Sequence, residues 1–562
     1  MLKSYNVKNF PHELIYIVAS YFNEDINQHS DILLLRSINR HWNSYKYTVI
    51  TDNIKYCSIF NVILDIRKCL SLESLCNIEN IIEITIECNL LQYIQNMVNL
   101  RHLNIICTYT KSCIYHSTIT PYLSNLTNLT KLSCIYCENI KDESIQYLTN
   151  LTYLECESCE NITNEGIKYL VNLSHLDCSY CEDITDEGIK YLTKLTHLKC
   201  SISDNITDES IKCLTNLTRL ECIHCPNITD EGIKCLTNLT MFDYLGCPNI
   251  TDEGIKCLVN LTKLECFDCL NITDESIKYL TKLVELRCRN CRNITGESIK
   301  YLTKLIDLDC SECINIIDES IKCLTNLTRL ECTECPNITD EGIKYLTNLT
   351  RLECTKCPNI TDEGIKYLTN LTYLDCSLCF DLTNEGIKYL TNLTYLDCPG
   401  CKNISDEGIK YLTNLTYLDC PGCYNISNEG IKYLTNLTYL NCSCCYNISD
   451  EGIKYLTNLT YLDCSDCSNI TNEGIKYLTN LTYLDCNCCY NITNEGIKNL
   501  TKLKTLIYSY DPNITDKNIK LLTNLRHLKN LTCIYGPNTV DEEFKSLVRL
   551  KYSNILKHIK IN

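Results

Sequence analysis

The chain has 562 residues, of which 45% are hydrophobic and 22% are charged, and its formal net charge is −17. A chain this acidic lacks the basic stripe that neutralises nucleic-acid phosphates, so nucleic-acid binding is not expected. No run of about 18 apolar residues occurs in it, so no membrane span is expected either.

Residues 10–45 form a segment with its own hydrophobic pattern. Pro11 suits the first position of a helix. Apolar residues follow it at the spacing of one helical face: Leu14, Ile17, Val18 and Tyr21. Asp31 can cap a second helix, whose apolar face contains Leu35, Ile38 and Trp42. So small a piece cannot bury this much apolar surface alone, and such surface usually contacts a partner.

The same segment contains most of a known sequence motif, LPxEL…SYL…DLLxLRxVNRxW. The matching residues are Pro11, Glu13, Leu14, Ser20, Tyr21, Phe22, Asp31, Ile32, Leu33, Leu35, Arg36, Asn39, Arg40 and Trp42. Together they resemble an F-box. The resemblance implies docking onto the Skp-type adaptor of an SCF-type (cullin–RING) ubiquitin ligase. The residues expected to face the adaptor, or to hold the helices that face it, are Pro11, Leu14, Ile17, Leu33, Leu35 and Trp42.

This resemblance has one departure and one competing interpretation. Eight residues separate Phe22 from Asp31, several more than the F-box pattern has, which affects the expected angle between the two helices. The competing interpretation is that residues 1–50 only cap the open end of the repeats that follow. The Pro-x-Glu-Leu and Asn-Arg-x-Trp spacings favour adaptor docking, because a cap does not require them.

Residues 51–133 are expected to be a linker followed by degenerate repeats. Two stretches fit the pattern L-x-x-L-x-L-x-x-N: Ile81, Ile84, Ile86 and Asn89, and then Leu100, Leu103 and Ile105. An insertion near residues 108–121 interrupts them. Degenerate units of this kind are typical of the ends of a repeat array.

Residues 134–527 repeat one 22-residue unit, from Cys134 to Tyr508 in 18 copies without insertion or deletion. The unit reads L-x-x-L-x-C-x-x-C-x-x-I-T-x-x-x-I-x-x-L. Its first part alternates as a half-buried strand does, and a Thr followed by an acidic residue then indicates a helix start. The unit resembles the cysteine-containing leucine-rich repeat. This implies an α/β solenoid, a horseshoe with a parallel inner sheet and short outer helices.

The 45 cysteines fall mainly in two columns of the repeat, which contain 32 of them. As Cys-x-x-Cys pairs they could bind zinc or form disulfides. The preferred interpretation is that they are buried framework residues, because Tyr244, Tyr508, Ser203 and Asp511 replace them without loss of the pattern. Free buried thiols predict a reducing compartment, the cytoplasm. Abundant Asn, Ile, Tyr and Lys are typical of A/T-rich coding sequences, as in amoebae or their giant viruses. For a viral protein the expected compartment is the cytoplasm of the host.

Residues 528–562 are expected to be degenerate C-terminal repeats and a cap. Leu528, Leu531 and Cys533 resume the frame after a shift of three residues.

The candidate target-binding residues lie between the framework positions, on the predicted concave face. The fifth position of the unit is Asp or Glu in 13 of 18 copies, and the third is Tyr in six consecutive copies from Tyr373 to Tyr483. A basic partner would relieve the repulsion among stacked carboxylates. The alternative is that duplication copied one repeat unit, here called a rung, and that its solvent-facing side chains have no binding function. The middle units depart from the repeat and carry arginines. The predicted target-binding residues are Phe267, Arg287, Arg289, Arg292, Arg329, Arg351, Tyr373, Tyr395 and Tyr417.

No catalytic constellation is recognisable: the sequence has no Gly-rich phosphate loop, no HExxH and no nucleophile elbow. We therefore expect a non-catalytic receptor subunit without a cofactor, monomeric outside its complex, that brings an unknown target protein to the ligase. The alternative is a protein-binding scaffold or decoy with no link to a ligase.

Overall fold

The computed structural model describes residues 120–509 without a break, and residues 83–107 except 89, 90, 92, 93 and 96. It also describes the strands at 47–49, 62–65, 530–534 and 558–561. The predicted F-box helices lie outside the described residues. The chain divides into two compact units, Met1–Glu265 and Cys266–Asn562.

The first unit contains a parallel sheet in which each strand pairs with the next one along the chain. Its strands are β1 (Tyr47–Val49), β2 (Val62–Asp65), β3 (Glu83–Glu87), β4 (His102–Ile106), β5 (Lys131–Ser133), β6 (Tyr153–Glu155), β7 (His175–Asp177), β8 (His197–Lys199), β9 (Arg219–Glu221), β10 (Met241–Asp243) and β11 (Lys263–Glu265). Its described helices are α3 (Thr120–Leu123), α4 (Asp142–Ile145), α5 (Asn164–Ile167), α6 (Asp186–Ile189), α7 (Asp208–Ile211), α8 (Asp230–Ile233) and α9 (Asp252–Ile255).

The second unit repeats this arrangement. Its strands are β12 (Glu285–Arg287), β13 (Asp307–Asp309), β14 (Arg329–Glu331), β15 (Arg351–Glu353), β16 (Tyr373–Asp375), β17 (Tyr395–Asp397), β18 (Tyr417–Asp419), β19 (Tyr439–Asn441), β20 (Tyr461–Asp463), β21 (Tyr483–Cys486), β22 (Thr505–Ser509), β23 (Asn530–Ile534) and β24 (His558–Ile561). Its described helices are α10 (Asp274–Ile277), α11 (Gly296–Ile299), α12 (Asp318–Ile321), α13 (Asp340–Ile343), α14 (Asp362–Ile365), α15 (Asn384–Ile387), α16 (Asp406–Ile409), α17 (Asn428–Ile431), α18 (Asp450–Ile453), α19 (Asn472–Ile475) and α20 (Asn494–Ile497).

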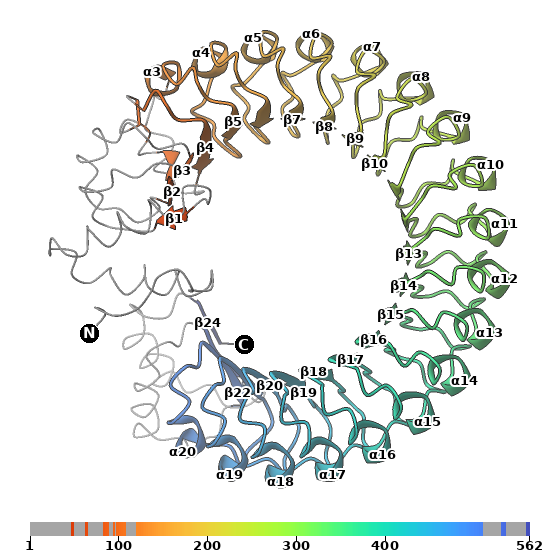
Figure 1. Ribbon diagram of the computed structural model, residues 1–562. Coiled ribbons are helices and arrows are strands. Elements are labelled where there is room, and N and C mark those ends of the chain that lie inside the picture. Colours follow the sequence, from red (N-terminus) through yellow and green to blue (C-terminus); the bar gives the residue numbers. More distant parts are fainter. Residues whose placement is uncertain are drawn as a thin grey trace, which may run out of the picture. The chain divides into compact units, whose positions relative to one another are not determined.

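Within each unit the strands line the inner side and the one-turn helices line the outer side (Figure 1). Leu, Ile and Cys side chains between these two layers are buried, as Leu374, Cys376 and Ile387 illustrate, each with 0% exposure. The predicted α/β solenoid with a parallel inner sheet and short outer helices is therefore confirmed in both units. Among the described residues, no helix combines the length and apolarity that a bilayer span requires.

In most repeat units, a threonine or serine is the N-cap residue of the helix. In α15 the Thr383 hydroxyl accepts a hydrogen bond from the Glu385 backbone N–H at 3.2 Å. The Asp362 carboxylate of the preceding rung in turn accepts bonds from the Thr383 backbone N–H (2.8 Å) and hydroxyl (2.5 Å). Gly386 permits this contact, because a Cβ there would lie 2.5 Å from Asp362 Oδ1. The same hydrogen-bond network thus caps the helix and joins each rung to the one before it.

Two asparagines in each regular rung bind the rung before it. Asn392 donates from Nδ2 to the Thr369 carbonyl at 3.0 Å, and Asn403 donates to the Phe380 carbonyl at 2.8 Å. These bonds satisfy carbonyls of the turns that no strand or helix pairs. The repeat pattern alone indicated no role for these asparagines.

The cysteine columns are buried framework, as predicted. Cys379, in the second column, donates from Sγ to the Cys354 carbonyl at 3.1 Å, and its side chain is 1% exposed. The described cysteines are free thiols. Burial raises the pKa of the Cys486 thiol well above its ordinary value, so the thiol stays protonated. A buried thiol that stays protonated, as Cys486 does, is an inert packing group.

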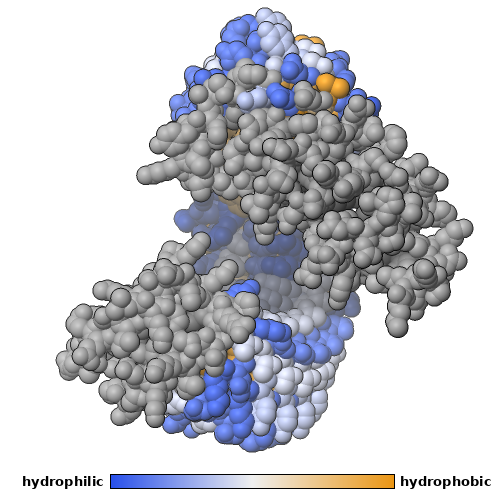
Figure 2. All heavy atoms as spheres, turned by 90° about the vertical axis from the view of Figure 1, so that its left-hand side faces the viewer, coloured by the Kyte–Doolittle hydropathy of each residue, from blue (hydrophilic) through white to orange (hydrophobic). Residues whose placement is uncertain are grey.

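The described surface seen in Figure 2 is predominantly hydrophilic. The large apolar side chains that are exposed are mostly tyrosines, such as Tyr389 at 55%. The outer turns also carry ion pairs between exposed side chains, for example Lys388 with Glu385 at 2.6 Å. Pairs of this kind contribute little stability each, so the buried Leu, Ile and Cys side chains hold the fold.

Candidate binding surface on the inner strands

The inner face of the second unit presents two parallel columns of side chains on β16–β21. Each of these strands buries its Leu and leaves the residue on either side of it half-buried, as in β16 with Tyr373 and Asp375. Parallel pairing in register stacks like residues on like. We call these columns the Tyr–Asp strip; it comprises Tyr373, Tyr395, Tyr417, Tyr439, Tyr461 and Tyr483 with Asp375, Asp397, Asp419, Asn441, Asp463 and Asp485.

The tyrosine rings of the strip form one continuous stack. Successive ring centroids lie 3.9–4.1 Å apart, from Tyr373 to Tyr483. Because each inner ring is covered on both faces by its neighbours, it offers a ligand its edge and hydroxyl only. Burial raises the pKa of Tyr417 above its ordinary value, so the hydroxyl of this residue remains neutral.

Arg351 lies at the first end of this stack. Its guanidinium carbon is 3.6 Å from the centroid of the Tyr373 ring, and its Nε donates to Glu353 at 2.8 Å. One guanidinium therefore makes a cation–π contact to the first tyrosine of the strip and an ion pair to Glu353, the carboxylate one strand before the strip.

Most of the arginines predicted to bind the target in the middle rungs are paired with carboxylates of the chain itself. Arg287 lies 2.7 Å from Glu285 and 3.2 Å from Asp307, and the exposed Arg289 lies 2.7 Å from Glu312. Arg329 contacts Glu331 and Asp307, Arg292 donates to Asn290 at 2.9 Å, and Phe267 is half-buried. Except for Arg292, these arginines are therefore neutralised by neighbouring acids.

The carboxylates of the Tyr–Asp strip have no such cations. Among the described residues, no ion pair joins Asp375, Asp397, Asp419, Asp463 or Asp485 to a Lys, Arg or His. Three of them instead accept a hydrogen bond from the backbone N–H two residues on: Asp375 from Ser377 (3.0 Å), Asp463 from Ser465 (3.0 Å) and Asp485 from Asn487 (3.0 Å).

Asp397 and Asp419 lack this backbone donor, because the residues two positions on are Pro399 and Pro421. Burial, followed by repulsion from Asp375 and Asp419, raises the pKa of Asp397 to about 7. Asp419 Oδ1 has no hydrogen-bond donor, and burial raises the pKa of this carboxyl too. These two rungs carry the least compensated acids of the strip.

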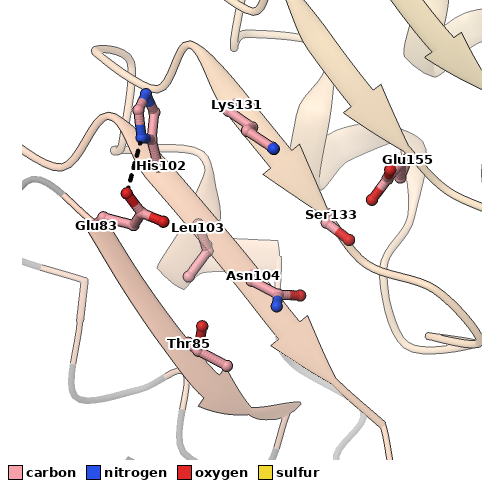
Figure 3. A pocket seen from close by; sticks show the side chains of 8 residues that line it. All are labelled: Glu83, Thr85, His102, Leu103, Asn104, Lys131, Ser133 and Glu155. Carbon is pink, nitrogen blue, oxygen red and sulfur yellow. Dashed lines mark hydrogen bonds and ion pairs between the residues drawn. The ribbon is translucent and has the colours of Figure 1, made fainter. Parts of the chain in front are cut away.

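The inner face of the first unit is different in character. Strands β3–β6 form a small pocket of about 140 Å³, lined by Glu83, Thr85, His102, Leu103, Asn104, Lys131, Ser133 and Glu155 (Figure 3). His102 Nδ1 lies 3.3 Å from Glu83 Oε2, and Lys131 lies over the Tyr153 ring at 4.1 Å. Glu155 accepts a hydrogen bond from the Tyr153 hydroxyl, so each ionisable side chain of this pocket already has a contact. Among the described residues, no group of three or more His, Cys, Asp or Glu side chains could hold a metal ion.

Two further histidines, conspicuous in the sequence, stack on this face. His175 lies over Tyr153 with centroids 4.1 Å apart, and His197 follows at 5.6 Å. Burial lowers the pKa of both imidazoles, so they are neutral at pH 7. They extend an aromatic stack, and the Thr196 hydroxyl, 2.9 Å from His197 Nδ1, also lies 3.0 Å from the Ser174 carbonyl.

Comparison with known proteins gives the repeat its name. The family described as "Leucine Rich repeat" matches residues 169–193, 433–456 and 455–478. This chain has a leucine-rich-repeat fold. No curated protein matches the sequence.

Several solved structures match the leucine-rich-repeat chain over most of its length. The functional domain of InlJ from Listeria monocytogenes, which includes a cysteine ladder, is 22% identical over 75% of this chain and 77% of its own, with a TM-score of 0.37. The TLR13–ssRNA13 complex is 16% identical over 87% and 93%, with a TM-score of 0.44. The Rad7–Elc1 complex from yeast is 20% identical over 60% and 82%, with a TM-score of 0.31.

Proposed function

We propose that this protein is the substrate-recognition subunit of an SCF-type ubiquitin ligase. The observation that carries the proposal is the F-box-like pattern of residues 10–45 ahead of a leucine-rich-repeat array. Pro11, Leu14, Ile17, Leu33, Leu35 and Trp42 would contact the Skp-type adaptor or position the helices that do.

The repeats would then hold the target protein. The parallel sheet would offer its inner face to the target, and tethering the target there raises the target's effective concentration at the ligase. The subunit itself would perform no covalent chemistry and need no cofactor. The buried free thiols suit the reducing cytoplasm in which such ligases act.

The test is co-purification of the full chain with a Skp-type adaptor. We expect the wild type to retain the adaptor and Leu14→Asp or Trp42→Ala to lose it, because a charge or a cavity would replace an apolar contact. Glu385→Gln, on the outer turn of a distant rung, serves as the control and should bind like the wild type. Failure of the wild type to bind, or equal binding by all variants, would contradict the proposal.

A second candidate is a protein-binding scaffold without a ligase. The observation that favours it is the eight-residue spacer at 23–30, longer than the F-box pattern has. The two candidates differ in one result: a scaffold would capture its target and never the adaptor.

A further inference from the structure

On the inner strands of the second unit, the carboxylates are paired with arginines on some strands and have no cation on others. In β14 and β15 each carboxylate has an arginine on its own strand, Glu331 with Arg329 and Glu353 with Arg351. From β16 to β21 the arginine position is tyrosine, and the carboxylates of the Tyr–Asp strip have no cation among the described side chains. Stacked like charges repel, and an opposite charge supplied by a partner would relieve that repulsion.

One of the two Pro–Gly rungs, Pro421–Gly422, also leaves room for a ligand group, whereas in the other, Pro399–Gly400, a Cβ at Gly400 would lie 3.2 Å from Leu378 Cδ2. The turn residue after each of these strands has a positive φ, Gly400 at 73° and Gly422 at 71°, where neighbouring rungs carry Leu378 or Cys444. A Cβ at Gly422 would meet nothing closer than Tyr424 Oη at 3.9 Å. The least compensated carboxylates, Asp397 and Asp419, thus share their rungs with the turns that lack a side chain.

Arg351 shows which cation fits such a rung. Its guanidinium pairs with Glu353 and packs on the face of Tyr373 at the end of the stack. At Asp397 and Asp419, where stacked neighbours cover the tyrosine faces, a guanidinium can pair with the carboxylate and reach the ring edges and hydroxyls. A planar guanidinium can donate to a carboxylate and to a neighbouring tyrosine hydroxyl in a fixed fork, whereas an ammonium acts as a point charge. Acidic or phosphate-bearing partners would be repelled by the strip.

We infer that the Tyr–Asp strip binds an arginine-bearing basic segment of a partner protein, with guanidinium groups paired to Asp397 and Asp419 beside Gly400 and Gly422. The inference rests on the proposed function in one respect only: it states which kind of target the recognition subunit selects. The binding surface moves accordingly from the arginine rungs to the tyrosine rungs.

The experiment measures fluorescence anisotropy of a labelled hepta-arginine peptide titrated with the full chain at pH 8. We expect saturable binding that is at least tenfold weaker for the double variant Asp397→Asn/Asp419→Asn. Asparagine is accommodated in this column, because Asn441 occupies it and accepts a bond from the Ser443 N–H at 3.0 Å. The matched control is Glu385→Gln/Glu407→Gln, which removes the same charge from the outer turns and should leave binding within twofold of the wild type.

A second variant keeps both carboxylates. Gly422→Leu introduces at this turn the residue that Leu378 provides at the equivalent turn, where φ is 59°. It should also weaken hepta-arginine binding by occupying the open space. Hepta-lysine should bind more weakly than hepta-arginine. Spermine binding with the same affinity and the same variant pattern would overturn the assignment to a protein segment.

Equal affinity of the strip variant and the outer-turn control would also overturn the inference, since it would mean that net charge alone attracts the peptide. The measurement needs no adaptor. A failure here therefore leaves the co-purification result intact, and a failure to bind the adaptor leaves the strip's selectivity intact.

Discussion

At the scale of single residues, the second-column cysteines are structural donors. Cys379 Sγ donates to the Cys354 carbonyl inside the core. We expect Cys379→Ser to lower the free energy of unfolding by about 1–3 kcal/mol, because the more polar hydroxyl is buried there. The exposed Cys323→Ser should change it by less than about 0.5 kcal/mol. Urea unfolding followed by circular dichroism compares the two. Equal effects would mean that the column contributes no specific packing.

Because the pKa of the Asp397 carboxyl is raised, we expect this residue to make stability depend on pH in an unusual way. Its pKa is raised to about 7 in the folded chain, by burial and by Asp375 and Asp419, with a smaller contribution from Glu353. The folded state therefore binds a proton that the unfolded state has released above about pH 4, and stability falls as pH rises from there to about 7.

Asp397→Asn should remove this part of the slope. At pH 8 we expect the variant to unfold at a higher temperature than the wild type, on the order of 2 °C, since the half-exposed group is partly screened. At pH 5 the two should coincide more closely. Melting curves at both pH values check this. A variant less stable than the wild type at pH 8 would show that the ionised carboxylate is stabilising.

At the scale of elements, α12 has a defective start. Its cap residue is Ile317, which makes no side-chain cap bond and is 42% exposed. The preceding rung has Gly296 where others have Asp or Asn, so the carboxylate that would bind a capping threonine is missing as well. This pair of rungs therefore lacks both the capping hydroxyl, as in Thr383, and the carboxylate that binds it, as in Asp362.

Ile317→Thr should restore the capping hydroxyl. The new hydroxyl can accept from the Glu319 backbone N–H, as Thr339 accepts from Glu341 at 3.2 Å in the next rung. We expect a gain of roughly 0.5–1 kcal/mol, below that of a complete cap because Gly296 offers no partner. Thr339→Ala should cost about 1–2 kcal/mol and serves as the opposite control. Denaturant midpoints of the full chain compare them, and a destabilising Ile317→Thr would refute the cap assignment.

How far the sequence predicts these elements depends on the range of the contacts. The 22-residue period identified β16 and α15, and it placed Leu374 and Cys376 in the core, because periodicity reports burial directly. It did not reveal the bonds between rungs, such as Asp362 to Thr383, since these depend on how stacked turns meet. The same limit applies to the arginines: their pairing with acids of adjacent strands, as for Arg287 and Asp307, depends on reach across the sheet, which residue identity does not give.

At the scale of the whole molecule, a repeat array contacts itself only between neighbours, so its stability is nearly a sum over rungs. The regular rungs of the second unit are interchangeable in their contacts: Asp406 accepts from the Ser427 N–H and Asp450 from the Thr471 N–H, each at 2.7 Å. A complete rung should therefore be removable without loss of the fold, provided that the 22-residue register is kept.

Deletion of residues 449–470 tests this. It removes α18 and β20 and joins two rungs whose partners are equivalent, because Asn428 accepts from the Ser449 N–H as Asn472 accepts from the Thr493 N–H. We expect cooperative unfolding within a few degrees of the wild type, and unchanged hepta-arginine binding because Asp397 and Asp419 remain. Deletion of residues 449–459, half a rung, should instead shift buried positions onto the surface and lower the melting temperature by far more. Equal losses in the two deletions would mean that the rungs are not independent units and that the array folds as one block.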